Sequence, residues 1–178
     1  MRHTRCVWCG TMAELIRRVT VEPTEDAYRV CSPQLVLRPA RADLHDGAYV
    51  ARWRNQEEAR AAFWNQAVVT PDSHVVWLRN KSPYDLVWLA AAAETGEIIG
   101  MAGLVVDPAT HSGEAGRYYV DREQRGRGYA VALDRMVLAF GFDYLRLAAL
   151  WIDAWANNAA IIATHRKAGW RMAGVDCP

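Results

Sequence analysis

Residues 125–130 read Arg125-Gly126-Arg127-Gly128-Tyr129-Ala130, and this segment decides which fold we expect. It lies between a segment of strand character that ends near Val120 and an apolar segment with helical spacing. Glycines allow the backbone to approach a ligand closely, and the free amides at the start of a helix attract an anion. The two arginines add charge suited to a diphosphate. The segment therefore predicts an anion-binding loop, although a tight turn with two solvated arginines would show the same pattern.

The segments on either side of this loop alternate between strand and helix character. Strand patterns cover residues 35–39, 86–93, 97–106, 112–120 and 147–156, and helical patterns cover residues 43–54, 56–64, 71–79, 133–144 and 158–168. Asp43 and Asn158 are suited to cap two of the helices, and Gly169 is suited to end the last one. The order predicts an α/β (α+β) fold in which helices pack on the faces of one mixed sheet.

Residues 1–34 differ from the rest, because prolines interrupt them and their patterns are short. We expect them to form an N-terminal extension that cofactor binding does not need, followed by one domain over residues 35–178. The segment Cys6-Val7-Trp8-Cys9-Gly10 is half of a zinc knuckle, and only His3 and Cys31 could complete four ligands. The expectation is that no metal binds.

Composition limits the partners of the chain. Lys plus Arg is 21 and Asp plus Glu is 20, so a net charge of +1 gives no reason to expect nucleic acid. The 52% of apolar residues fall in short runs, none close to the ~20 needed to span a membrane. The first residues carry charges and cysteines in place of a secretory signal. We expect a cytoplasmic protein with reduced thiols that binds neither nucleic acid nor membranes.

The loop and its flanks together resemble the GNAT superfamily of N-acetyltransferases. Residues 125–130 match the pyrophosphate-binding motif of that family, in which Gln or Arg is followed by two variable residues, Gly, another variable residue, and Gly or Ala. Residues 114–120 look like its fourth strand, and residues 158–170 look like its closing helix and turn. The resemblance implies a mostly antiparallel sheet with a splayed central strand pair that admits acetyl-CoA as a wedge. A full final strand would follow the turn at Gly169.

The resemblance also implies which residues hold the cosubstrate. Backbone groups of one strand would pair with the pantetheine arm, and the loop would bind the diphosphate. The residues expected to bind acetyl-CoA are Tyr118, Tyr119, Val120, Arg125, Gly126, Arg127, Gly128, Tyr129, Ala130 and Asn158. Transfer to an amine would then be direct, with no covalent enzyme intermediate and no metal.

Three residues are candidates for acid-base catalysis, because the amine must lose a proton and the departing thiolate must gain one. His165 stands where the family often has the tyrosine that protonates the thiolate, and helical spacing points it inward. A core histidine would show the same spacing. Glu114, at the start of the fourth strand, could act as a base through water or could be a solvated strand-end charge. His74 could lie beside the amine.

A second group of residues predicts the acceptor site. Trp53-Arg54-Asn55, Phe63, and His74 followed by Trp77 resemble GNATs that acetylate nucleotide-linked amino sugars, of the pseudaminic acid pathway type. They resemble the ribosomal-protein N-terminal acetyltransferases less closely. Aromatic faces would stack on a base or sugar, and Arg54 would pair with a diphosphate. Tryptophans at helical spacing also fit a protein core.

Three functions follow from these patterns. The first is N-acetylation of a small-molecule amine, an amino sugar carried by a nucleotide. The second is acetylation of protein N-termini or of small amines, which would require an acidic acceptor cleft. The third is a GNAT module that binds acetyl-CoA without turnover. The sequence leaves the oligomeric state open, and a homodimer fits it as well as a monomer does.

Overall fold

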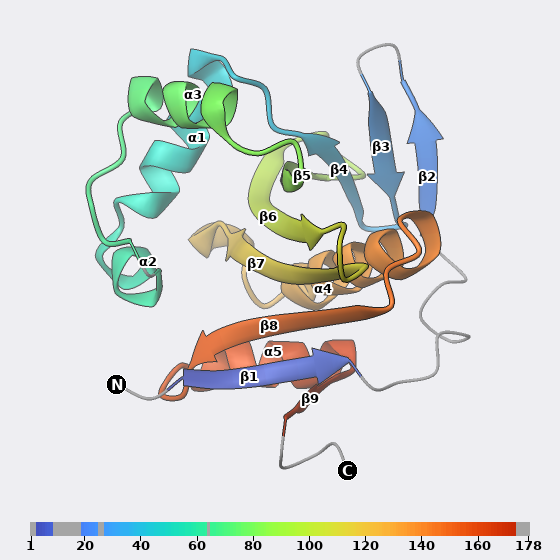
Figure 1. Cartoon of the computed structure of the whole chain (residues 1–178). Coiled ribbons are helices and arrows are strands. Elements are labelled where there is room, and N and C mark those ends of the chain that lie inside the picture. Colours follow the sequence, from blue (N-terminus) through green and yellow to red (C-terminus); the bar gives the residue numbers. More distant parts are fainter. Residues whose placement is uncertain (1–2, 9–18, 25–26, 64, 174–178) are drawn as a thin grey trace.

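The computed structural model describes residues 3–8, 19–24, 27–63 and 65–173, and Figure 1 shows their arrangement. The described strands form one sheet in the order β2-β3-β4-β5-β6-β7-β8-β1-β9. The strands are β1 His3–Trp8, β2 Thr20–Pro23, β3 Tyr28–Cys31, β4 Leu35–Pro39, β5 Asp85–Ala92, β6 Ile98–Asp107, β7 Ser112–Val120, β8 Ala149–Trp155 and β9 Trp170–Met172. In the described chain no helix is long and apolar enough to cross a membrane.

The sheet is antiparallel except where β7 meets β8. Those two strands run parallel and pair only from Ser112↔Ala149 to Glu114↔Trp151. Beyond these residues β7 continues to Val120 and β8 continues to Trp155, and the two strands separate (Figure 1). The prediction of a mixed, mostly antiparallel sheet with a splayed central pair is therefore confirmed.

Helices cover both faces of the sheet. The described helices are α1 Leu44–Arg54, α2 Glu57–Ala62, α3 Pro71–Asn80, α4 Tyr129–Ala139, continued by a π-helical turn Phe140–Tyr144, and α5 Ala159–Ala168. Alternation along β5 divides the core, because Trp88 and Ala90 pack in the cluster that contains α4, whereas Val87 and Leu89 pack with α1 and α3. Two hydrophobic cores therefore lie on opposite faces of one sheet.

Local signals in the sequence account for the helix ends. Asp43 accepts a hydrogen bond from the Asp46 N–H at the start of α1, and Asn158 accepts one from the Ile161 N–H at the start of α5. Thr70 and Ser73 form a reciprocal capping box at α3. Gly169 ends α5 with φ 111°, a left-handed conformation that favours glycine.

The strands before residue 35 lie at both ends of the sheet. The hairpin of β2 and β3 extends the edge beside β4, whereas β1 lies between β8 and β9 and pairs antiparallel with both. Arg5 of β1 binds Asp153 of β8 through two hydrogen bonds of 2.9 Å. The sheet is thus continuous across residue 34, where the sequence predicted a boundary, because backbone pairing with distant strands holds these short segments. That cofactor binding can do without them stays a prediction.

Two expectations about the first residues fall partly outside the described chain. Cys6 is buried within β1, but Cys9 and the helical stretch expected near residues 12–18 lie outside the described residues. A metal at the Cys-x-x-Cys pair is therefore not addressed by the structure.

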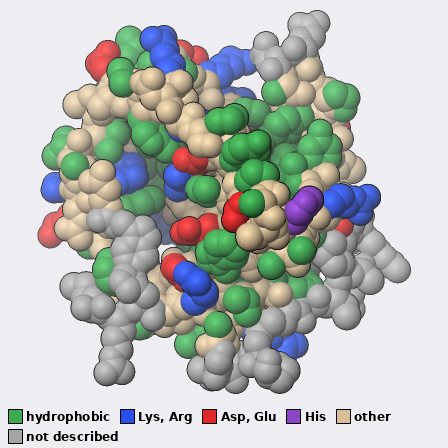
Figure 2. Space-filling view, in the orientation of Figure 1, with side chains coloured by type: hydrophobic (Ala, Val, Ile, Leu, Met, Phe, Trp, Pro, Cys, Tyr) green, Lys and Arg blue, Asp and Glu red, His purple; other side chains and the backbone are tan. Residues whose placement is uncertain are grey.

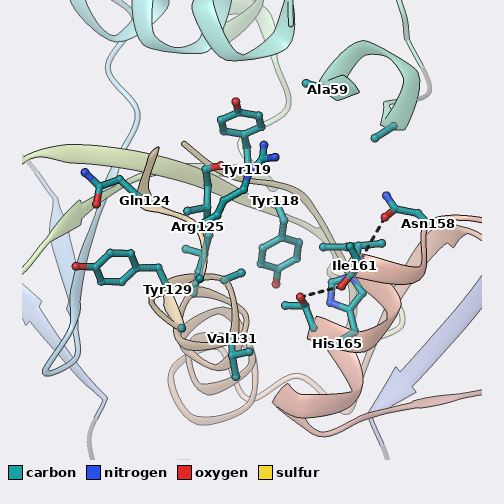
Figure 3. A pocket seen from close by; sticks show the side chains of 18 of the residues that line it. Ala59, Tyr118, Tyr119, Gln124, Arg125, Tyr129, Val131, Asn158, Ile161 and His165 are labelled. Atoms are coloured by element: carbon teal, nitrogen blue, oxygen red, sulfur yellow. Dashed lines mark hydrogen bonds between the residues drawn. The ribbon is translucent and has the colours of Figure 1, made fainter. Parts of the chain in front are cut away.

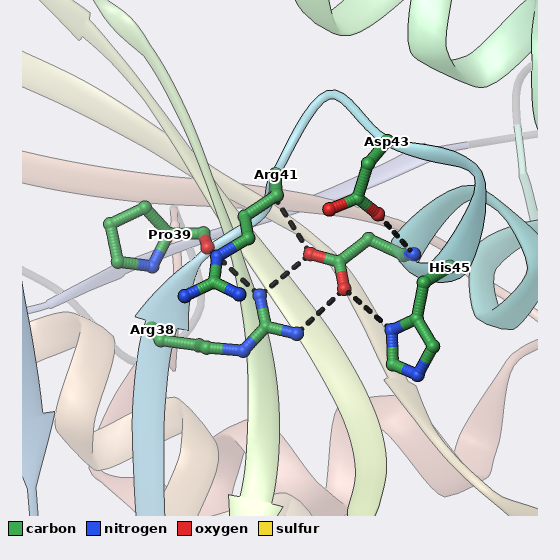
Figure 4. Close-up of polar contacts among 6 residues, drawn as sticks. Arg38, Pro39, Arg41, Asp43 and His45 are labelled. Atoms are coloured by element: carbon green, nitrogen blue, oxygen red, sulfur yellow. Dashed lines mark hydrogen bonds and ion pairs between the residues drawn. The ribbon is translucent and has the colours of Figure 1, made fainter. Parts of the chain in front are cut away.

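A buried ion pair fixes the start of α1 against β4 (Figure 4). The Arg38 guanidinium donates to both carboxylate oxygens of Asp46 at 2.6 Å, and the Arg41 N–H donates at 2.7 Å. His45 Nδ1 lies 3.4 Å from the same carboxylate. The ligand atoms of Asp43, His45 and Asp46 lie within 4.8 Å of one another. Because both oxygens of Asp46 already bind Arg38, this grouping is explained without a metal.

Replacing Asp46 by Asn should lower the free energy of unfolding by about 3 kcal/mol, because the half-buried Arg38 guanidinium would lose the counter-charge of a buried carboxylate. Burial by itself would raise the pKa of the Asp46 carboxyl, but the hydrogen bonds and charge of Arg38 and the Arg41 N–H together lower it. The stabilisation by the Asp46 carboxylate is therefore fully present above the pKa that Asp46 has in the unfolded chain. It is lost as the pH falls through the lower pKa that Asp46 has in the folded protein. Urea unfolding at several pH values measures both effects.

The matched control is Asp72→Asn, at an exposed position in the first turn of α3. It should cost about 0.5 kcal/mol or less. Equal losses in the two variants would show that the Arg38–Asp46 pair does not stabilise the fold.

Candidate active site

A cleft opens where β7 and β8 separate (Figure 3). Its volume is about 540 Å³. Its walls come from the end of β7, the loop of residues 124–130, the first turn of α4, one side of α5, and α2. Because the strands diverge, backbone groups that would otherwise pair across the gap are left without a neighbouring strand. A ligand placed there can supply the missing partners.

The glycine loop has the geometry of an anion site. Gly126 and Gly128 both have φ 83°, which other residues adopt only with strain. Among the described atoms nothing lies within 4 Å of a Cβ built on Gly126, and only Gln34 Nε2, at 3.9 Å, approaches one built on Gly128. Gly128 begins α4 without a side-chain cap, so the first amides of an eleven-residue helix face open space.

The two arginines of the loop have different surroundings. Arg125 Nε donates to the Val120 carbonyl at 3.1 Å, and its guanidinium lies 2.8 Å from Glu58 of α2 and over the Tyr119 ring. Arg125 therefore links the loop to β7 and α2 across the cleft. Arg127 is exposed and does not line the cleft. Its predicted contact with a diphosphate would need the side chain to turn toward the loop.

The end of β7 presents a backbone edge to the cleft. Residues Tyr119 and Val120 pair with β6 on one side, and no described strand pairs with them on the other. Tyr118 points toward α4 and α5, whereas Tyr119 stacks on Trp53 at 5.3 Å and donates to Gln56. An extended ligand arm could therefore add to this edge as a strand would. Tyr129, Ala130 and Asn158 also line the cleft, and their binding of acetyl-CoA stays a prediction.

His165 lies in the wall of the cleft and is only 1% exposed. Its Nδ1 is 2.6 Å from Asp134 Oδ2, and Trp170 Nε1 donates to Asp134 Oδ1 at 2.8 Å. The Tyr118 ring lies edge-on to the imidazole, with centroids 5.6 Å apart. His165 Nε2 has no hydrogen-bond partner among the described residues. This nitrogen is the one left for a ligand.

Asp134 was missed by the sequence reasoning. It lies in α4 beside Leu133 and Val137, on the buried face of the helix, and is 0% exposed. The available signal was a carboxylate inside an apolar helical stripe, since acids are rarely buried without a partner. Its partners are 31 and 36 residues away along the chain, so the sequence did not identify them.

The other two acid-base candidates lie outside the cleft. Glu114 is exposed in β7, in the part of the strand that still pairs with β8. His74 is 6% exposed in α3, and its ring stacks on Trp77 at 5.3 Å. Burial, and then the charge of Arg54, lowers the pKa of His74 to about 4. The structure brings neither group to the wall that contains His165.

The predicted acceptor residues divide into two groups. Trp53 is 0% exposed and donates to Asp121, and the Asn55 amide bonds to both backbone groups of Val69. The polar groups of both side chains therefore form hydrogen bonds within the protein. Arg54 lies over the Phe63 ring at 3.9 Å, and Phe63 lines the cleft. Of the predicted acceptor residues, only Phe63 lines the cleft, with Arg54 directly behind it.

Trp77 belongs to a neighbouring polar group outside the cleft. Arg117 lies 5.4 Å from the Trp77 ring centre and donates to Asp85 at 2.8 Å.

Figure 2 shows Lys and Arg side chains close to Asp and Glu side chains near the centre of the face in view. This face therefore does not carry a single sign of charge.

A splayed strand pair with a glycine loop at one end forms a cleft suited to a ligand that has an anionic group and an extended arm. The chain belongs to the GNAT acetyltransferase family, because the sequence model of the acetyltransferase (GNAT) domain matches residues 34–171. The protein is thus an acetyltransferase of that family. A comparison with curated proteins gave no match.

Solved structures share the fold at low sequence identity. A spermidine N-acetyltransferase from Vibrio cholerae, in complex with CoA and spermine, superposes with a TM-score of 0.67 at 17% identity, over 76% of this chain and 80% of that one. A putative ribosomal-protein-serine acetyltransferase from the same organism gives 0.61 at 16%, over 79% and 82%. A putative GNAT acetyltransferase from Novosphingobium aromaticivorans gives 0.56 at 19%, over 96% and 59%. These superpositions show that the fold is shared, and at such low sequence identity they leave the acceptor open.

Replacing Gly128 by Asp should largely abolish CoA binding, because a carboxylate would enter the space for the diphosphate and the φ of 83° would be strained. Calorimetric titration with CoA measures the loss. Gly96→Asp is the matched control, since Gly96 has φ 72° in an exposed turn with no described atom near its Cβ position. If the Gly128 variant binds CoA as the parent does, the loop is not the phosphate site.

Proposed function

We propose that this acetyltransferase uses acetyl-CoA and transfers the acetyl group directly to a primary amine in the cleft between β7 and β8. The observation that carries the proposal is the separation of the two strands beside the uncapped start of α4. The open edge of β7 would hold the pantetheine arm, and the amides of residues 126–130 would hold the diphosphate. Acetyl-CoA would supply the activated thioester, so the protein itself needs only to position the two substrates and to move protons between them.

His165 is the residue we assign to proton transfer at the sulfur. Histidine is the side-chain type that exchanges protons near neutral pH, and His165 Nε2 is free of described protein partners at the cleft wall. The Tyr118 phenol is a poor substitute as a base, because burial, followed by the charge of Asp134, raises its pKa well above the ordinary value. Lys167 and Arg125 also line the cleft and are cations.

His165→Phe should lower turnover by ~10²-fold or more, the scale of losing one acid-base group. CoA affinity should be nearly intact, because the ring contributes no part of the glycine loop. The control His45→Phe changes an exposed histidine outside the cleft. Steady-state rates and calorimetry on both variants separate the two effects, and an unchanged rate would leave His165 with a packing role.

For the acceptor we propose an amino sugar linked to a nucleotide. Arg54 and Phe63 support this proposal, because a guanidinium 3.9 Å above an aromatic ring offers both a cation and a stacking surface beside the cleft. Arg54 Nε has no hydrogen-bond partner in the described part of the chain. Burial, followed by the charge of Arg117, lowers the pKa of Arg54. A diphosphate would relieve the repulsion between these two arginines.

A polyamine or a peptide N-terminus is the competing acceptor. Such cations need acidic groups, and Glu58 is the one acid among the described residues that line the cleft. Its carboxylate is already 2.8 Å from Arg125. A neutralised carboxylate attracts a cation less strongly, so this arrangement favours an anionic acceptor.

Arg54→Ala should raise the KM for an amino-sugar nucleotide far more than the KM for acetyl-CoA, because Arg54 lies away from the glycine loop. Arg79→Ala, at an exposed position in α3, is the control and should change neither constant. The parent and both variants should be assayed with amino-sugar nucleotides, free aminoglycosides, polyamines and short peptides. Preferential acetylation of peptides or polyamines would contradict the proposed acceptor, and tight CoA binding without any transfer would favour a non-catalytic module.

A further inference from the structure

We propose that Asp134 and His165 form a proton shuttle, in which His165 first takes the proton from the acceptor amine and then gives it to the departing sulfur. Asp134 is the positioning residue of this pair. The inference rests on the proposed function and deepens it, because one histidine would replace the separate base and acid that we sought in Glu114, His74 and His165.

The hydrogen bonds to Asp134 determine how the imidazole is held. Trp170 Nε1 is only a donor, so Oδ1 of Asp134 accepts at 2.8 Å. An ionised carboxylate is an acceptor at both oxygens, so the His165 Nδ1–H donates to Oδ2 at 2.6 Å. The neutral ring then carries its proton on Nδ1. Its Nε2, which is buried and has no described hydrogen-bond partner, then carries the free lone pair, which is the form a general base requires.

The burial of His165 makes a partner for its charge necessary. After it accepts a proton at Nε2, the ring is an imidazolium that is 1% exposed, and an unpaired buried charge is costly. Asp134 supplies a negative charge 2.6 Å from Nδ1. The elements packed around His165 also carry, near it in the sequence or in space, Tyr118 of β7, Arg135 of α4, and Arg166 and Lys167 of α5 itself. Of these, Arg135, Arg166 and Lys167 are exposed and Tyr118 stays protonated.

The proton balance of the reaction closes within this pair. The amine nitrogen forms a bond to the thioester carbonyl carbon, and its proton passes to His165 Nε2. The carbon–sulfur bond breaks with its electron pair on sulfur, and the proton on Nε2 passes to that sulfur. The products are an amide and a thiol, and His165 returns to its starting form. No oxidant, metal or second acid is required.

The sheet holds the shuttle in place from the side opposite the cleft. Trp170 is the first residue of β9, and it pairs with Trp8 of β1. The indole that orients Asp134 is therefore anchored through a strand from the other end of the chain. Cys6 of β1 pairs with Met172 in the same ladder.

Asp134→Asn tests the shuttle, because it keeps the shape of the side chain and removes its charge. We expect kcat to fall by ~10²-fold or more while the KM for acetyl-CoA is unchanged. Asp143→Asn, outside the cleft, is the matched control and should behave as the parent.

Nitrogen NMR of the His165 ring in the unmodified protein gives a test that needs neither the variant nor an acceptor. Neutral His165 should show its proton on Nδ1, and Asp134→Asn should weaken this preference. A proton on Nε2 in the parent, or a parental kcat in a folded Asp134→Asn protein, would overturn the inference. If the parent acetylates no amine, the proposed function fails, and the ring tautomer still decides whether Asp134 positions His165.

Discussion

The separation of β7 from β8 is the constraint on which the rest of this structure depends. Parallel strands normally satisfy each other's backbone groups along their length, yet these two pair only around Gly113 and Leu150 and then diverge. The unpaired edge of β7 must find partners elsewhere. The glycine loop, the start of α4 and the wall of α5 all line the opening that this divergence creates, so the cosubstrate binding and the proton transfer that we propose would share one geometric cause.

The charges near the cleft follow a common rule. A chain with a net charge of +1 has no general field to attract an anion, so the anion site that we propose would depend on backbone amides at a helix start and on local arginines. Charges that the fold does bury are paired, as Arg38 with Asp46 and His165 with Asp134. Arg54 is the exception in the described chain, because its Nε is buried without a described partner. That imbalance is why we connect Arg54 with an anionic acceptor.

The strand β1 ties the two ends of the described chain together. Its pairing with β8 and β9 holds Trp170 against Asp134, and Arg5 adds an ion pair with Asp153 on the same strands. The chemistry of the cleft is thus supported by residues that the sequence placed in an extension.

The sequence by itself determined the parts of this protein that local chemistry governs. Caps such as Asp43 and Asn158, the turn at Gly169, the alternation of the strands and the glycines of the loop act within a few residues, so their patterns predicted elements and their order. The same patterns supported the family and the inward direction of His165. Only the tertiary structure decided that Trp53 and Asn55 serve the protein itself, that His74 and Glu114 lie outside the cleft, and that β1 joins the far side of the sheet. It also revealed Asp134. Each of these depends on contacts between residues far apart in the chain, and a single sequence carries no periodicity or spacing that records such contacts.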